Sequence, residues 1–306
     1  MARIRSASVF LMVLLCLSVP VADCKRHRSD AHADRMKEIR RQVKEGQAQA
    51  VVYELESITR NNPKDVEAWV LLSKVYTDLD MSSSGGKMIG KAMDAAKNAV
   101  AAQPDNSTAL KNLAELHAQR GNFKEALSLI DRAIAAPRQD PFVYKSKALM
   151  LSELKRDKEA VAAWDMFAST HPAANTSPNQ MDDGALIYAR GGLTDKACAL
   201  YDKLNAVSPS EKWILKKAEA YSMGGRTNQA IGVYSELIKL HPGDELALME
   251  RAKLKSKLGK HKEALADMDA AIKEMPTSRM YLERASIYEK LGNAKMAQRD
   301  REKARE

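Results

Sequence analysis

An alanine recurs along most of this chain at an almost constant interval, and this period constrains the fold more than any other feature. The intervals between successive copies are 34, 34, 37, 33, 34 and 33 residues. The recurring alanines are Ala92, Ala126, Ala160, Ala197, Ala230, Ala264 and Ala297. A period of this length is typical of solenoids, in which each repeat is one small unit that stacks on its neighbours.

Two further patterns keep the same period. Upstream of the alanine, a bulky residue, a small or apolar residue and a tyrosine follow one another, as in Trp69, Leu72 and Tyr76. This three- and four-residue spacing predicts two amphipathic helices in each repeat. A proline follows most alanines by twelve residues and ends the second helix, because proline lacks an N–H group and clashes with the preceding turn. These prolines are Pro104, Pro172, Pro209, Pro242 and Pro276.

Taken together, these residues resemble the tetratricopeptide repeat (TPR) family, and the resemblance covers nearly all of the chain after its N-terminal segment. The family has a small residue at position 8 of each repeat, tyrosine at 11, alanine at 20, an aromatic residue at 24 and proline at 32. Here Ala160 occupies position 20 and Trp164 position 24 of one repeat. The resemblance implies an all-α fold, a right-handed superhelical solenoid of about eight helix-turn-helix repeats.

The chain is expected to have three parts: a signal peptide over residues 1–22, a basic polar linker over 23–31 and a TPR solenoid over 32–306. The repeats are predicted near 32–65, 66–106, 107–140, 141–177, 178–210, 211–244, 245–277 and 278–306. Polar inserts near 80–86 and 173–177 exceed the period and predict surface loops. They are either tolerated insertions or flaps that bind a partner.

The N-terminal segment has the pattern of an export signal. Arg3 and Arg5 precede an apolar run from Val9 to Ala22. A basic start followed by a short apolar run is typical of secretory signals, whereas a membrane-spanning helix needs about 20 apolar residues. We therefore expect an exported protein in the periplasm or at the outer membrane of a bacterial envelope. The alternative is a buried first helix.

Cys24 is a candidate site of lipidation. The stretch Val21-Ala22-Asp23-Cys24 resembles the lipobox of bacterial lipoproteins, although Asp23 departs from the small residue expected there. Acylation of Cys24 would attach the chain to a membrane, and the alternative is cleavage after Ala22. The chain has only three cysteines, which excludes a disulfide-stapled scaffold and a cysteine-based zinc site.

No pattern in the chain points to catalysis, a metal site or a cofactor. Ser84-Gly85-Gly86-Lys87 lacks both the first glycine and the final serine or threonine of a phosphate-binding loop. The six histidines are scattered without recurring ligand spacing. We therefore expect a protein that is not an enzyme. The alternative is a catalytic protein that uses the insert near 80–88.

The formal net charge of +9 does not by itself indicate nucleic-acid binding. The 49 lysines and arginines are interleaved with 40 acidic residues, and no platform combines aromatic with basic residues. The basic residues are densest between Lys25 and Lys44. After an export signal, this favours an acidic protein or peptide partner or an anionic envelope surface, and no nucleic acid is expected as a ligand.

In the TPR family, positions 2, 5, 6, 9, 12 and 13 of the first helix line a concave groove that holds peptides. Carried over to this chain, the implied partner-binding residues are Lys37, Arg40, Lys44, Lys111, Asn112, Glu115, Phe142, Lys145, Leu149, Arg190 and Lys216. Lys111 and Lys145 both occupy position 5, and both are expected to be exposed. A row of exposed cations would favour a partner with acidic character.

The resemblance implies a scaffold or adaptor that binds a partner protein or peptide in this groove. Combined with export, it suggests a role in pilus, polysaccharide-export or outer-membrane assembly. The alternative is a cytosolic adaptor that keeps its N-terminus. The clamp by which some family members hold chaperone tails is absent, because Glu115 and Ser146 replace two of its asparagines.

Overall fold

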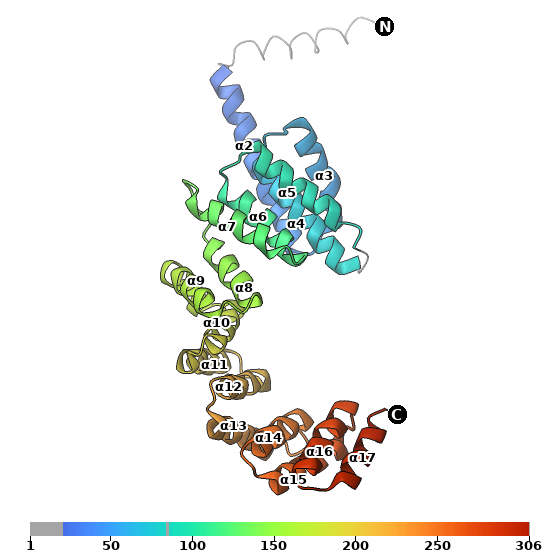
Figure 1. Ribbon diagram of the computed structural model, residues 1–306. Coiled ribbons are helices and arrows are strands. Elements are labelled where there is room, and N and C mark those ends of the chain that lie inside the picture. The colour runs from blue at the N-terminus through green and yellow to red at the C-terminus, as the bar shows by residue number, and fades with distance from the viewer. Residues whose placement is uncertain (1–20, 84–85, 306) are drawn as a thin grey trace, which may run out of the picture. The chain divides into compact units, whose positions relative to one another are not determined.

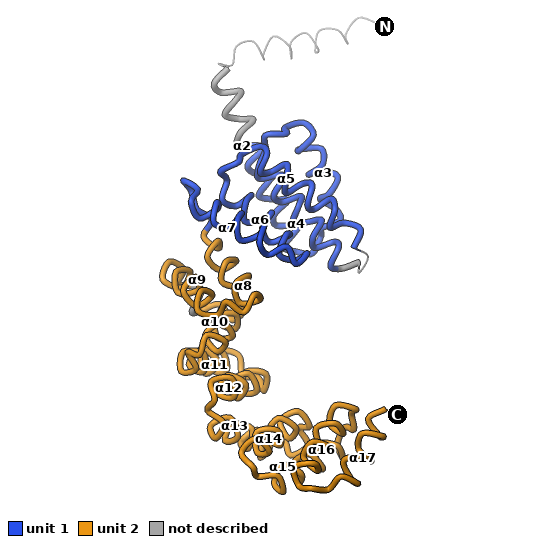
Figure 2. The backbone as a smooth tube through the Cα atoms, viewed as in Figure 1, with its two compact units in different colours: residues 1–140 blue, residues 141–306 orange. Residues whose placement is uncertain are grey.

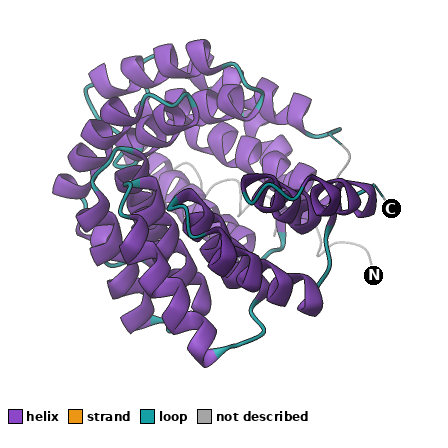
Figure 3. Ribbon diagram, turned by 60° about the horizontal axis from the view of Figure 1, so that its bottom comes forward, coloured by secondary structure: helices purple, strands orange, loops and turns teal. Residues whose placement is uncertain are grey.

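A computed structural model describes residues 21–83 and 86–305, and it consists of helices joined by short loops (Figures 1 and 3). Sixteen α-helices, one short 3-10 helix and no strand occur in these residues. The predicted all-α solenoid of the TPR type is confirmed. The chain divides after Asp140 into two compact units, coloured separately in Figure 2.

Unit 1 holds three consecutive pairs of helices. Its helices are α2 (Val21–Lys44), α3 (Ala48–Asn61), α4 (Val66–Ser83), α5 (Ile89–Ala102), α6 (Ser107–Gln119) and α7 (Phe123–Ala135). The predicted linker over 23–31 is helical, since α2 contains all of it. Neither proline nor glycine occurs in α2, so no residue there ends the helix. The predicted signal peptide lies outside the described residues except for its last two positions.

The insert near 80–86 lengthens the first helix of its repeat. Helix α4 continues to Ser83, whereas the equivalent helix α6 has only 13 residues. The backbone N–H of Met88 donates to Asp80 Oδ1 at 2.7 Å, which ties the described start of α5 back to the end of α4. Part of the predicted loop is therefore a helical extension.

Unit 2 holds five pairs of helices. They are α8 (Val143–Glu153), α9 (Asp157–Thr170), α10 (Pro178–Arg190), α11 (Thr194–Val207), α12 (Glu211–Met223), α13 (Thr227–Leu240), α14 (Glu245–Lys257), α15 (His261–Glu274), α16 (Ser278–Lys290) and α17 (Ala294–Lys303). A 3-10 helix, η1 (Pro172–Asn175), occupies most of the second predicted insert. Among the described residues, no helix is both long and apolar enough to cross a membrane.

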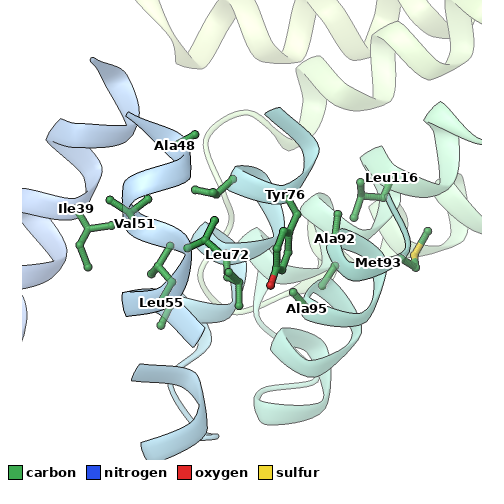
Figure 4. Close-up of a cluster of buried hydrophobic side chains, with 14 of the residues drawn as sticks. Ile39, Ala48, Val51, Leu55, Leu72, Tyr76, Ala92, Met93, Ala95 and Leu116 are labelled. Carbon is green, nitrogen blue, oxygen red and sulfur yellow. The ribbon is translucent and has the colours of Figure 1, made fainter. Parts of the chain in front are cut away.

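The recurring alanines explain how the helices of a repeat approach each other. All seven are at most 1% exposed. A methyl side chain at this position lets the two backbones pack closely, while larger side chains fill the space around it. In unit 1, Ala92 of α5 lies beside Leu72 and Tyr76 of α4, and Val51 and Leu55 of α3 extend the same core (Figure 4).

The turn between the two helices of a repeat needs one residue with positive φ. Glycine takes this position in most repeats, as Gly121 does at φ 77°. In the fourth repeat Lys155 takes it instead, at φ 56°. A residue with a Cβ atom is strained in this left-handed region, so the fourth repeat forms the same turn at a cost that the others avoid.

Candidate interaction surface

The first helices of successive repeats lie against one another within each unit. In unit 1 these are α2, α4 and α6, and in unit 2 they include α8, α10 and α12. We call the surface formed by positions 2, 5, 6, 9, 12 and 13 of these helices the inner face of each unit. All eleven residues predicted to bind a partner lie on or at the start of these first helices.

A pocket of about 190 Å³ opens on the inner face of unit 1. It is lined by Val43, Leu71, Lys74, Thr77, Asp78, Asn112, Glu115, Leu116 and Gln119, so α2, α4 and α6 all contribute. Asn112 and Glu115, which the sequence analysis assigned to the partner-binding groove, are among these lining residues. It missed Lys74, although Lys74 occupies position 9 of its repeat and could have been found by the same register.

Lys74 is the cation of this pocket that has no ion-pair partner among the described residues. Solvent reaches its side chain, yet the pocket walls displace enough water to lower the pKa of its ammonium group, and Lys111 lowers it further. Burial likewise raises the pKa of the Asp78 carboxyl in the same pocket. The pocket therefore combines apolar walls with charges that solvent and neighbours stabilise incompletely.

The expectation that Lys111 is exposed is wrong. It is only 7% exposed, and its Nζ lies 3.4 Å from Glu115 Oε1 and 3.7 Å from Asp140 Oδ1. Asn112 is also buried, and its Nδ2 donates to Ser73 Oγ of α4 at 2.8 Å. Asn112 therefore joins neighbouring repeats, whereas Lys111 pairs with acids of its own repeat.

The inner-face cations of α2 differ in whether they form an ion pair within the unit. Arg40 forms an ion pair with Glu67 of α4, so its charge is compensated within the unit. Lys37 and Lys44 are exposed and form no ion pair within the described part of the chain. With Lys74, they are the inner-face cations of unit 1 that a partner could neutralise.

On the inner face of unit 2, the predicted cations pair with acids of neighbouring repeats. Lys145 Nζ of α8 lies 2.7 Å from Asp183 Oδ2 of α10, and Lys216 Nζ of α12 donates to Asp182 Oδ2 at 2.7 Å. Arg190 Nη1 donates to Ser152 Oγ at 2.9 Å. These contacts lie between successive first helices, so they stabilise the stack and leave no row of free cations at these positions.

Large apolar side chains are exposed on the same face. Two of them were predicted: Phe142 is 41% exposed and Leu149 is 36% exposed. Met223, a groove residue of the sixth repeat, is 51% exposed, and three others were missed, namely Leu186, Leu246 and Leu282, with exposures between 37% and 52%. Their positions in the repeat are groove positions, so the register would have found them. Large apolar side chains such as Tyr53 and Leu240 are exposed elsewhere as well, so the groove positions of these residues, rather than their exposure alone, suggest an interaction surface.

Metal-binding clusters and reactive thiols are two features that catalysis could use among the described residues. No group of three or more histidine, cysteine, aspartate or glutamate side chains in them could hold a metal ion. Cys198 is buried, and burial raises the pKa of its thiol, which disfavours the reactive thiolate. Cys24 lies in α2, and residues 84–85 of the candidate insert are outside the described part.

Two stretches of the sequence, residues 87–150 and 214–244, match family profiles described as tetratricopeptide repeat. No curated protein matches the chain. A tetratricopeptide repeat protein from Parabacteroides merdae ATCC 43184 has a similar structure, with 23% identity and a TM-score of 0.54, over 75% of this chain and 92% of that one.

Two further solved structures share the fold. YrrB, described as a TPR protein with an unusual peptide-binding site, is 14% identical with a TM-score of 0.50, over 63% of this chain and 95% of its own. A chain of the Cut9–Hcn1 hetero-tetramer of APC/C is 13% identical with a TM-score of 0.51, over 87% of this chain and 47% of its own.

Proposed function

Because this chain belongs to the tetratricopeptide repeat family, we propose that it is a non-catalytic scaffold that binds a partner protein or peptide on the inner faces of its two units. Stacked repeats create extended surfaces of this kind, and TPR proteins are in general scaffolds rather than enzymes. YrrB, with the same fold, is described by its peptide-binding site, which supports a peptide or protein ligand here.

The pocket between α2, α4 and α6 is the observation that carries this proposal. It joins three repeats, it has apolar walls from Val43, Leu71 and Leu116, and it contains the unpaired ammonium group of Lys74. Burial lowers the pKa of this ammonium group, although the nearby acids Glu115, Asp140 and Asp78 act to raise it, so a carboxylate of a ligand would stabilise the charged form further.

We propose that the segment bound by unit 1 is acidic. Lys37, Lys44 and Lys74 are the inner-face cations there without an ion pair among the described residues. A carboxylate of the partner would pair with Lys74, and the two lysines of α2 would steer its approach. Nucleic acid is not part of this proposal, since Arg40 and Lys111 are already neutralised by acids of the same unit.

We further propose that the protein is exported and acts in a bacterial cell envelope, in pilus, polysaccharide-export or outer-membrane assembly. The proposal rests on Arg3, Arg5 and the apolar run from Val9 to Ala22. Sequencing of the mature N-terminus tests it. A blocked chain that begins at acylated Cys24 would establish a lipoprotein, and a chain that begins at Asp23 would establish cleavage after Ala22. An intact Met1 in a cytosolic fraction would contradict export.

A random peptide library displayed on phage and selected on the immobilised full chain tests the scaffold. Enriched peptides should be acidic where they bind unit 1, and Lys74→Glu should weaken them roughly tenfold or more. Lys97→Glu makes the same charge change at an exposed site on α5, outside the inner face, and should leave binding unchanged. Failure to enrich any peptide, or equal losses in both variants, would contradict the proposal.

A further inference from the structure

Glu219 of α12 is an exposed carboxylate on the inner face of unit 2, and Lys216 and Lys253 are near enough to act on its charge. Its side chain is exposed and forms no hydrogen bond or ion pair with a described residue. On the next first helix, α14, Glu250 and Lys253 pair with each other at 2.9 Å. The packed helices around Glu219, and Glu250 to a smaller extent, raise the pKa of its carboxyl.

Exposed apolar side chains flank this carboxylate on two sides. Leu186 occupies position 9 of α10, as Glu219 does of α12, and these two helices contact each other. Met223 follows Glu219 by one helical turn on α12. Leu186 is 37% exposed and Met223 is 51% exposed. A segment laid across α10 and α12 would therefore meet two exposed apolar side chains together with a carboxylate that forms no direct ion pair.

We propose that Leu186, Glu219 and Met223 bind a partner segment that carries a lysine or arginine beside a large apolar side chain. This rests on the proposed scaffold function and specifies the chemistry of the ligand for unit 2. It is opposite in charge to the acidic segment proposed for unit 1, so the two inner faces recognise different sequences, in one partner or in two.

Charge complementarity favours a basic segment over the other kinds. An acidic segment would place a further carboxylate beside Glu219 and Glu250, and like charges repel. A purely apolar segment would cover Glu219 without supplying a positive charge to pair with it. Burial of an unpaired charge is costly in free energy. The nearby cations cannot attract an acidic ligand strongly, because Lys216 already pairs with Asp182 and Lys145 with Asp183.

The probe for this proposal is a random 12-residue peptide library displayed on phage and selected on the full chain, followed by fluorescence anisotropy with the enriched peptides. We expect a class of peptides with a lysine or arginine adjacent to leucine, methionine or phenylalanine. Glu219→Lys and Leu186→Asp should each weaken this class roughly tenfold or more. Glu236→Lys, the same change at an exposed site on α13, should have no effect.

Circular dichroism of each variant shows whether the fold is intact, and Glu219→Lys decides the question alone if Leu186→Asp does not fold. Should the enriched peptides respond to Lys74→Glu but not to Glu219→Lys, this proposal is wrong while the scaffold function stands. A basic-apolar class that binds equally well to Glu219→Lys would also overturn it. With no peptide enriched at all, both this proposal and the scaffold function fail.

Discussion

Arg284 of α16 and Asp300 of α17 form a bidentate ion pair with two contacts of 2.7 Å, and Asp300 is only 1% exposed. Arg251 and Asp267 form the same pair one repeat earlier, at 2.7 and 2.9 Å. The guanidinium group matches both oxygens of a carboxylate, so each pair fixes the two helices of its repeat against each other. Each buried acid thus has an arginine as a direct ion-pair partner.

Loss of the arginine should therefore destabilise unit 2. Arg284→Ala leaves Asp300 buried without its bidentate partner, and we expect a loss of about 3–5 kcal/mol in the free energy of unfolding. The double variant Arg284→Leu/Asp300→Leu removes both charges and should recover most of it. Urea denaturation followed by circular dichroism measures both. Equal midpoints for Arg284→Ala and the native chain would show that the pair is not structural.

Reversal of charge at Lys111 should damage unit 1 because Lys111 is buried between two acids. Lys111→Glu places a third carboxylate beside Glu115 and Asp140, and we expect a loss of at least about 3 kcal/mol. Lys97→Glu, at an exposed site on α5, should change stability little. The urea midpoints of the two variants give the comparison. Similar midpoints would mean that Lys111 is not held as described.

Gly184 and Gly232 both lie inside helices, and replacement by alanine should have opposite effects on stability. A Cβ atom at Gly184 would lie 2.7 Å from the indole of Trp164, which is fully buried and cannot move aside. Gly184→Ala should therefore cost about 1–3 kcal/mol. No atom lies within 4 Å of a Cβ at Gly232, so Gly232→Ala should stabilise unit 2 by about 0.5–1 kcal/mol. Thermal unfolding of both variants checks the sign of each.

Removal of the charge at Lys74 should stabilise unit 1 and weaken its ligands. The folded state lowers the pKa of Lys74 below its ordinary value of 10.5, so the unfolded chain binds this proton more tightly. Stability of the native chain therefore rises with pH between these two values. Lys74→Met should be more stable at neutral pH, with a gain that shrinks as the pH approaches 10.5. A gain that persists unchanged at alkaline pH would contradict the assignment.

The fold was predictable because its determinants are local and repeat. Each recurring alanine, such as Ala160, carries the same information in its own repeat, so departures at single positions do not hide the period. The same register pointed to Asn112 and Glu115, which line the pocket of unit 1, and to Phe142 and Leu149, which are exposed.

The repeat period did not predict whether each charged side chain on that face is buried or forms an ion pair. Lys111 and Lys145 occupy equivalent positions, yet one is buried near Asp140 and the other reaches Asp183 of the next repeat. Whether an inner-face lysine is free depends on which acid the neighbouring repeat presents, and the repeat pattern leaves that residue undefined. For this reason the absence of an ion pair at Lys74 and Glu219 among the described residues became visible only in the structure.

The central claim is that the inner faces bind the partner and the outer helices do not. Photo-crosslinking in the native cell tests it most directly, with a benzophenone amino acid placed at Lys37, Leu186 or Met223 on the inner faces and at Lys97 or Glu236 on outer helices. All five side chains are exposed, so the substitutions leave the core intact. We expect discrete crosslinked species from the inner positions and none from the outer ones. Crosslinks that arise from Lys97 or Glu236 while the inner positions give none would contradict the account.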